Sequence, residues 1–331
     1  QIDAALDEYR RALVFSPQDI GSLLGIGQMF REKGDVEQAI EYLIKARAID
    51  PDHRGVRFQL ALCFELQGQL DQAQTEYRQA LRIDPKFTDG HFNLAVLYER
   101  TGQIEAAESH YQEVIRLKPD FTEAYNNLGL LHDRLGHSQK ALDAYLRAIA
   151  INPDYARAHN NIGVLYWKNG ALGQAQAAFQ KALSLDPSLA QAHYNLGAVL
   201  EAQHAYTGAA DAYQTAIRLD ATHRDAIFGL GSVYQALGDN EKAEAAYLRL
   251  LDLDPNDVAA RLKFAEILDV EGKTEGAIDA YERVLQTTPD DADALNNLGV
   301  LFFKKKAYQK ALDCLNRANI NDPQRADIQN N

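Results

Sequence analysis

The chain has 331 residues, of which 46% are hydrophobic and 24% charged, so it is long enough for two ordinary domains or one extended array. Its formal net charge of −13 argues against a nucleic-acid partner, because a phosphate backbone is bound by clustered Lys and Arg side chains, and it favours neutral or basic partners instead. No apolar run approaches the roughly 18 residues of a membrane span, so no membrane partner is expected for this segment.

The two cysteines, Cys63 and Cys314, show no metal-binding or redox spacing. We interpret both as small, buried apolar residues, and we expect no metal or other cofactor. Two unpaired thiols favour a reducing compartment such as the cytoplasm without establishing one.

The prolines reveal how the chain is organised. All nine follow one spacing, at 17, 51, 85, 119, 153, 187, 255, 289 and 323. Every interval is 34 residues, except one of 68 that passes over Ala221. A fixed period of this size predicts stacked helical repeats.

Numbering each unit so that proline is position 32 divides the whole chain, 1–331, into one array. Residues 1–19 are a half repeat with the second helix only; full repeats follow at 20–53, 54–87, 88–121, 122–155, 156–189, 190–223, 224–257, 258–291 and 292–325; residues 326–331 begin a further helix. Position 20 is always Ala, position 8 is Gly or Ala, and position 24 is aromatic or Leu. Each unit therefore predicts helix A, a turn with Gly at position 15, and helix B packed closely against helix A. The fold class is predicted as an all-α solenoid.

The repeat resembles the tetratricopeptide repeat over essentially the whole chain. In the unit 122–155 the motif positions are held by Leu128, Gly129, Gly136, Ala141, Tyr145, Ala148 and Pro153. The resemblance implies a right-handed superhelix in which A helices line a concave groove. Two units lack the turn glycine and have His204 or Lys306 there, and we expect local changes in those loops.

Position 6 of helix A faces away from helix B and is the main candidate for binding. It is Asn in four consecutive units and in the last one, namely Asn93, Asn127, Asn161, Asn195 and Asn297. Asn is a poor helix former, yet its amide matches the C=O and N–H groups of an extended peptide. The row also resembles the asparagines that hold substrate backbone in the repeat domain of O-GlcNAc transferase. The alternative is that position 6 is simply a polar surface position.

Neighbouring positions extend this candidate surface. Val96, Leu130 and Val164 lie at position 9 on the same face, and the flank at position 5 adds Phe92, Asn126, Asn160 and Tyr194. Trp167, the only Trp in the chain, is at position 12. Exposed apolar residues suggest a surface that receives a ligand, although packing against the next A helix would explain Trp167 equally well.

No catalytic motif accompanies the repeats, so we predict a non-catalytic scaffold that binds an extended segment of a partner protein in the groove. Two alternatives remain open. The array could assemble head to tail into a homo-oligomer through uncapped ends, or it could be the substrate-recognition arm of a larger enzyme such as a glycosyltransferase.

Overall fold

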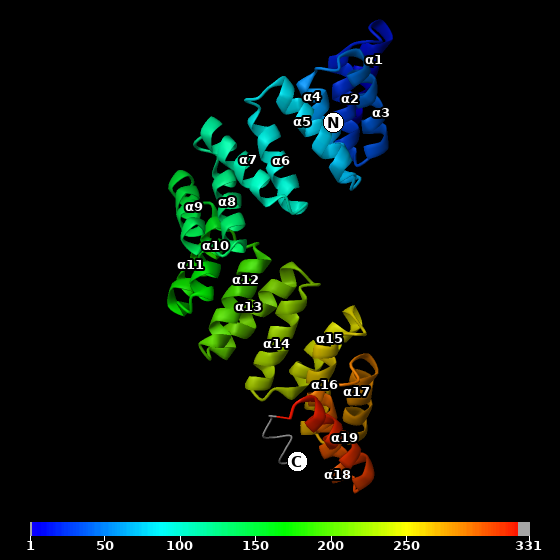
Figure 1. The fold of residues 1–331 in the computed structure, drawn as a ribbon, viewed down its shortest axis with the longest axis vertical. Coiled ribbons are helices and arrows are strands. Elements are labelled where there is room, and N and C mark those ends of the chain that lie inside the picture. The colour runs from blue at the N-terminus through cyan, green and yellow to red at the C-terminus, as the bar shows by residue number, and fades with distance from the viewer. Residues whose placement is uncertain (1, 324–331) are drawn as a thin grey trace. The chain divides into compact units, whose positions relative to one another are not determined.

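The computed structural model describes residues 2–323, which contain nineteen α-helices and no strand (Figure 1). The even-numbered A helices are α2 (Ile20–Lys33), α4 (Arg54–Leu66), α6 (Thr88–Arg100), α8 (Thr122–Arg134), α10 (Ala156–Lys168), α12 (Ala190–Ala202), α14 (Arg224–Ala236), α16 (Val258–Val270) and α18 (Ala292–Lys304). The odd-numbered B helices are α1 (Ile2–Phe15), α3 (Val36–Ile49), α5 (Leu70–Ile83), α7 (Ile104–Leu117), α9 (Ser138–Ile151), α11 (Leu172–Leu185), α13 (Tyr206–Leu219), α15 (Asn240–Leu253), α17 (Thr274–Thr287) and α19 (Tyr308–Asn321). The helix expected to begin at 326–331 lies outside the described residues.

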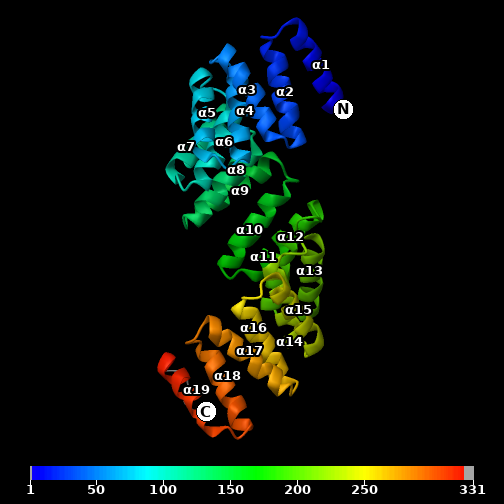
Figure 2. The same ribbon diagram turned by 90° about the vertical axis from the view of Figure 1, so that its right-hand side faces the viewer.

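The chain divides into two compact units, residues 1–158 and 159–331, with the division inside α10. Within each unit successive helices lie side by side, as the two views in Figures 1 and 2 show. The A helices of neighbouring repeats also contact one another, as α2 contacts α4 and α12 contacts α14. The predicted fold class, an all-α helical-repeat solenoid, is confirmed.

The A and B helices of a repeat pack through one small residue and one large one. A Cβ atom added to Gly163 would lie 2.6 Å from the ring of Phe179, and one added to Gly197 would lie 2.7 Å from the ring of Tyr213. The alanines at position 20 of the nine full repeats are buried, at most 2% exposed. Because the small residues admit the rings so closely, each ring is removed from water, which is worth about 1.5–3 kcal/mol per large apolar side chain.

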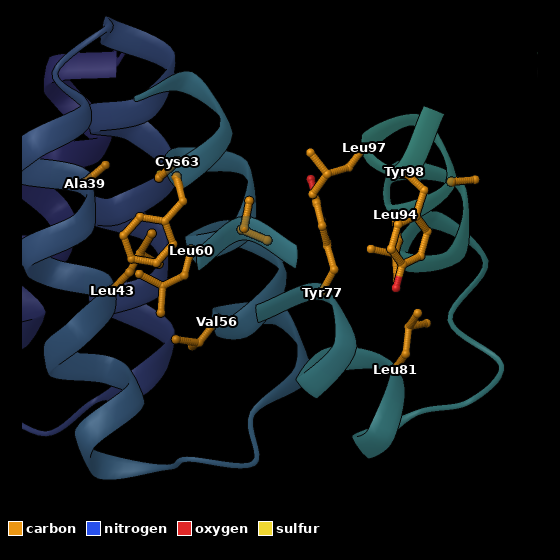
Figure 3. Close-up of a cluster of buried hydrophobic side chains, with 14 of the residues drawn as sticks. Ala39, Leu43, Val56, Leu60, Cys63, Tyr77, Leu81, Leu94, Leu97 and Tyr98 are labelled. Carbon is orange, nitrogen blue, oxygen red and sulfur yellow. The ribbon is translucent and has the colours of Figure 1, made fainter. Parts of the chain in front are cut away.

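Figure 3 shows this packing in the first unit, where Leu43, Leu60, Tyr77 and Leu94 belong to one cluster of buried side chains. Cys63 is part of the cluster, and burial raises the pKa of its thiol to about 11. Its predicted burial is confirmed. The same prediction is wrong for Cys314, which is partly exposed.

The turns between helices A and B keep one backbone conformation in every full repeat. Seven of them place Gly at positive φ, between 73° and 87°. His204 and Lys306 adopt φ values of 59° and 61° at the equivalent position, so the loop changes we expected there do not occur. The helix packing on both sides holds these two residues in a conformation that costs a non-glycine residue about 1–2 kcal/mol.

Replacing Lys306 with Gly is therefore expected to stabilise the protein, by on the order of 1 kcal/mol, because glycine adopts the left-handed region without this steric cost. A rise in the midpoint of guanidinium unfolding, followed by circular dichroism, would show it. Gly136→Ala is the reverse control and should lower the midpoint, since the space around Gly136 is open and only the φ of 75° opposes the new methyl group. An unchanged or lower midpoint for Lys306→Gly would contradict the explanation.

A pair of histidines lies between α6 and α7 in the first unit. The Nδ1 atoms of His91 and His110 are 2.8 Å apart and their rings are 5.0 Å apart. One Nδ1 must donate and the other accept, so this contact is lost when both imidazoles are protonated. Burial, together with repulsion from His91 and Arg78, lowers the pKa of His110 from 6.5 to about 4.

This lowered pKa predicts a loss of stability in mild acid. As the pH falls from 6.5 towards 4, the unfolded chain protonates His110 while the folded chain resists, so unfolding takes up a proton and becomes more favourable. The thermal midpoint should fall between pH 7 and pH 5, and His110→Gln should reduce that fall because it removes the titrating group. An equal fall in both proteins would exclude His110 as its source.

Candidate functional site

In two repeats the asparagine at position 6, the main candidate from the sequence, contacts the position-24 tyrosine of the preceding repeat. Asn127 Nδ2 donates to the hydroxyl of Tyr111 at 3.4 Å, and Asn297 Nδ2 donates to the hydroxyl of Tyr281 at 3.2 Å. These asparagines are partly exposed, yet each has an intramolecular partner. The unfavourable helix propensity of Asn thus has a structural explanation in addition to any role in binding.

The remaining asparagines of the row, which follow Tyr77, Tyr145 and Phe179, make further contacts. Position 24 before Asn195 is Phe179, which has no hydroxyl, and Asn195 Nδ2 donates instead to Asn160 Oδ1 at 3.0 Å. Asn161 Oδ1 accepts from Asn160 Nδ2 at 3.3 Å. In the first unit, Asn93 Nδ2 donates to the carbonyl of Asp89 at 2.8 Å.

The residues predicted to flank the row differ in accessibility. Asn126 is only 3% exposed, so the expectation that it lies on an open flank is wrong: its side chain turns inward and donates to Asn127 Oδ1 at 3.3 Å. Phe92 packs against the rings of Tyr111 and Phe121, with centroids 6.0 and 5.0 Å away. Val96 and Leu130, in the same unit, are partly exposed.

In the second unit the structure brings several predicted residues together around two adjoining cavities. The smaller one, about 290 Å³, is lined by Val164, Trp167, Lys168, Phe179, Tyr194, Asn195 and Ala198. The larger one, about 460 Å³, is lined by Trp167, Tyr194, Ala198, Glu201, Ala202, Tyr213, Asp225, Phe228, Gly229 and Ser232. Trp167, Tyr194 and Ala198 belong to both. We refer to the two together as the Trp167 cavity.

Position 6 of the last A helix around the larger part is Gly229 and not Asn. A Cβ atom added to Gly229 would lie 2.6 Å from Tyr213 Cζ and 2.9 Å from its hydroxyl. The ring of Tyr213 therefore occupies the place where other repeats carry an amide side chain. No amide side chain lies at this position, and Tyr213 lines the cavity although it is only 2% exposed.

Sequence reasoning missed Glu201, Asp225, Phe228 and Ser232, although one pattern could have found the first. In all six full repeats with Tyr at position 24, position 12 is Glu, Asp or Gln, and in the other three it is Arg31, Trp167 and Phe303. The tyrosine hydroxyl donates to this residue in four of the six pairs: Tyr77 to Glu65, Tyr111 to Glu99, Tyr213 to Glu201 and Tyr247 to Gln235, at 2.5–3.0 Å. Trp167 thus stands where a hydroxyl acceptor is not needed, because its ring partner is Phe179.

Burial and nearby carboxylates raise the pKa values of the tyrosines that line the cavity. Burial and the hydrogen bond to Glu201 raise the pKa of Tyr213 well above its usual range. Burial raises the pKa of Tyr194 as well, and the charges of Asp225 and Glu201 act in the same direction. The phenolate form of both tyrosines is thus disfavoured even more than that of a free tyrosine, and both hydroxyls can donate hydrogen bonds.

No group of three or more His, Cys, Asp or Glu side chains among residues 2–323 is arranged to hold a metal ion. Within the same range no helix is both long and apolar enough to cross a membrane.

The stacked helix pairs define a helical-repeat protein, and comparisons with known proteins identify the family. A family model described as the cilia and flagella-associated protein 70 C-terminal domain matches residues 88–296, and two tetratricopeptide repeat models match residues 19–86 and 271–330. The chain belongs to the tetratricopeptide repeat family.

Solved structures agree with this assignment. YrrB, described as a tetratricopeptide repeat protein with an unusual peptide-binding site, is 31% identical with a TM-score of 0.52; the match covers 57% of this chain and 97% of that one. PilF of Pseudomonas aeruginosa is 22% identical with a TM-score of 0.57, over 65% of this chain and 96% of that one, and supports the fold alone. The comparison with curated proteins gave no match.

Glu201 is expected to hold the cavity wall through two hydrogen bonds, which it accepts from Tyr213 at 2.7 Å and from Ser232 Oγ at 2.8 Å. Glu201→Ala leaves the hydroxyl of Tyr213, a residue only 2% exposed, without its acceptor, and should cost about 1–3 kcal/mol in the free energy of unfolding. Glu201→Gln keeps an acceptor oxygen and should cost much less. Chemical unfolding of both variants tests this, and equal losses would show that the hydrogen bonds contribute little.

Proposed function

We propose that this protein is a non-catalytic scaffold that binds an extended segment of a partner protein along the exposed face of its A helices. Membership of the tetratricopeptide repeat family supports the general role in protein–protein interaction. The choice of this face and of an extended ligand comes from the residues that lie on it.

The observation that carries the proposal is the unused hydrogen-bonding capacity of the asparagines. An Asn amide has two N–H donors and two acceptor lone pairs. Asn195 uses one of each among the described residues: it donates to Asn160 and accepts from Gln191 Nε2 at 3.1 Å. Asn127 likewise donates to Tyr111 and accepts from Asn126. One donor and one acceptor remain on each amide, and they match the C=O and N–H groups of an extended peptide ligand.

The same internal hydrogen bonds make these amides better suited to binding. An amide held by its neighbours has already lost rotamer freedom, so less entropy is lost when a ligand binds. Partly exposed Val164 and the Trp167 cavity lie on the same face of the second unit and would receive apolar side chains. YrrB, which is described by its peptide-binding site, is a precedent for peptide binding on this fold.

The proposal predicts that Asn161→Ala with Asn195→Ala will weaken partner capture by the second unit at least fivefold, because two backbone-binding amides are removed. The corresponding pair for the first unit is Asn93→Ala with Asn127→Ala. Quantitative affinity capture with mass spectrometry, compared with the wild-type protein, measures the effect. Circular dichroism checks that each variant remains folded.

A matched control replaces two asparagines away from this face. Asn169 lies in the turn after α10, and Asn240 begins α15. The variant Asn169→Ala with Asn240→Ala should capture the same proteins as wild type. If all three double variants capture partners equally well, the A-helix face is not the binding surface.

A further inference from the structure

A row of ion pairs links successive A helices, and the carboxylate at the Trp167 cavity lacks such a pair. A base at position 13 of one repeat pairs with the acid at position 12 of the repeat before it. Arg100 lies 2.9 Å from Glu65, Arg134 lies 2.7 Å from Glu99, and Lys304 lies 3.0 Å from Asp269. Each pair places a cation against the carboxylate that faces the neighbouring repeat.

This row is interrupted at the cavity. Position 13 is Ala202 in α12 and Ala236 in α14, so no base from the next repeat reaches Glu201. The Glu201 carboxylate accepts hydrogen bonds from two neutral hydroxyls only, and no cation of the described residues lies within 4.0 Å of it. Asp225, on α14, lines the same cavity and has no ion pair within the described part of the chain.

Aromatic rings complete the cavity. Trp167, Tyr194 and Phe228 come from three successive A helices and line its larger part, to which no Lys or Arg of residues 2–323 contributes. Rings of this kind attract a cation placed over their faces, because the ring quadrupole is negative there. Two carboxylates without a cationic partner add attraction of the same sign.

We propose that the larger part of the Trp167 cavity receives the guanidinium group of an arginine in the partner's extended segment, an assignment that rests on the proposed function. Arginine fits better than lysine because its planar guanidinium stacks on aromatic rings and donates several N–H bonds in a fixed fork to carboxylates. It would take the place that Arg100 and Arg134 occupy beside Glu65 and Glu99 in the first unit.

Trp167 makes the proposal directly measurable, because it is the only Trp in the chain and it lines the cavity. The probes are N-acetyl-arginine methylamide and its neutral analogue N-acetyl-citrulline methylamide, titrated into the full chain while Trp emission is recorded. We expect a saturable change with the arginine derivative and at least tenfold weaker binding of the citrulline derivative.

Two variants locate the effect. Glu201→Gln keeps one acceptor oxygen for Tyr213 and places an NH2 group, which can donate to the Ser232 hydroxyl, on the other side. It removes the charge, and it should weaken binding of the arginine derivative at least fivefold. Glu65→Gln changes the same repeat position where Arg100 is already the partner, and should leave binding unchanged. Equal binding of arginine and citrulline derivatives, or wild-type affinity of Glu201→Gln, would overturn the proposal.

Titration with N-acetyl-lysine methylamide distinguishes the two basic side chains, and we expect it to bind more weakly than the arginine derivative. Equally tight binding would overturn the assignment to arginine. These titrations contain no partner protein. They can therefore fail while the asparagine variants still lose partner capture, which would reject only the arginine site. Arginine binding without any effect of the asparagine variants would reject the proposed function instead.

Discussion

The contact between a small residue on helix A and a large side chain on helix B is the constraint on which the rest of this structure depends. Gly163 and Gly197 leave room for Phe179 and Tyr213, and the rings fix how closely the two helices approach. Once a buried tyrosine fills that space, its hydroxyl needs a hydrogen-bonding partner. Some of the polar residues along the A helices meet that need: an acid or amide at position 12 in four repeats, and an asparagine from the next repeat at Tyr111 and Tyr281.

This dependence explains why the fold could be predicted from sequence and the site only in part. The 34-residue spacing of prolines, with Ala at position 20, specifies helix pairs whatever their surface residues are. Helix rotation puts Asn127 and Asn195 on the side away from helix B, and both side chains are partly exposed. Rotation could not show that Tyr111 and Asn160 take up part of their hydrogen-bonding capacity, or that Asn126 turns inward, because these outcomes depend on contacts between neighbouring helices.

The Trp167 cavity arises from three local departures from the repeat rather than from any added motif. Phe179 removes a hydroxyl and allows Trp167 at position 12, Gly229 removes an amide, and Ala236 removes the base that would pair with Glu201. Each departure alone would be a small change in a stacked array. Together they place aromatic and acidic side chains around one cavity. In this sequence the residues that differ from the repeat pattern therefore indicate the cavity better than the residues that follow it.

The tyrosine contacts also bear on how such an array can be recombined. The hydroxyl of Tyr111 connects Glu99 in its own repeat with Asn127 in the next, so cutting the chain at Pro119 separates partners that belong together. A transplanted segment that keeps both hydrogen bonds must include Glu99 and Asn127 together with the complete helices that carry them, from α6 to α8. The unit that is copied in the sequence is therefore not the unit in which the buried polar groups are satisfied.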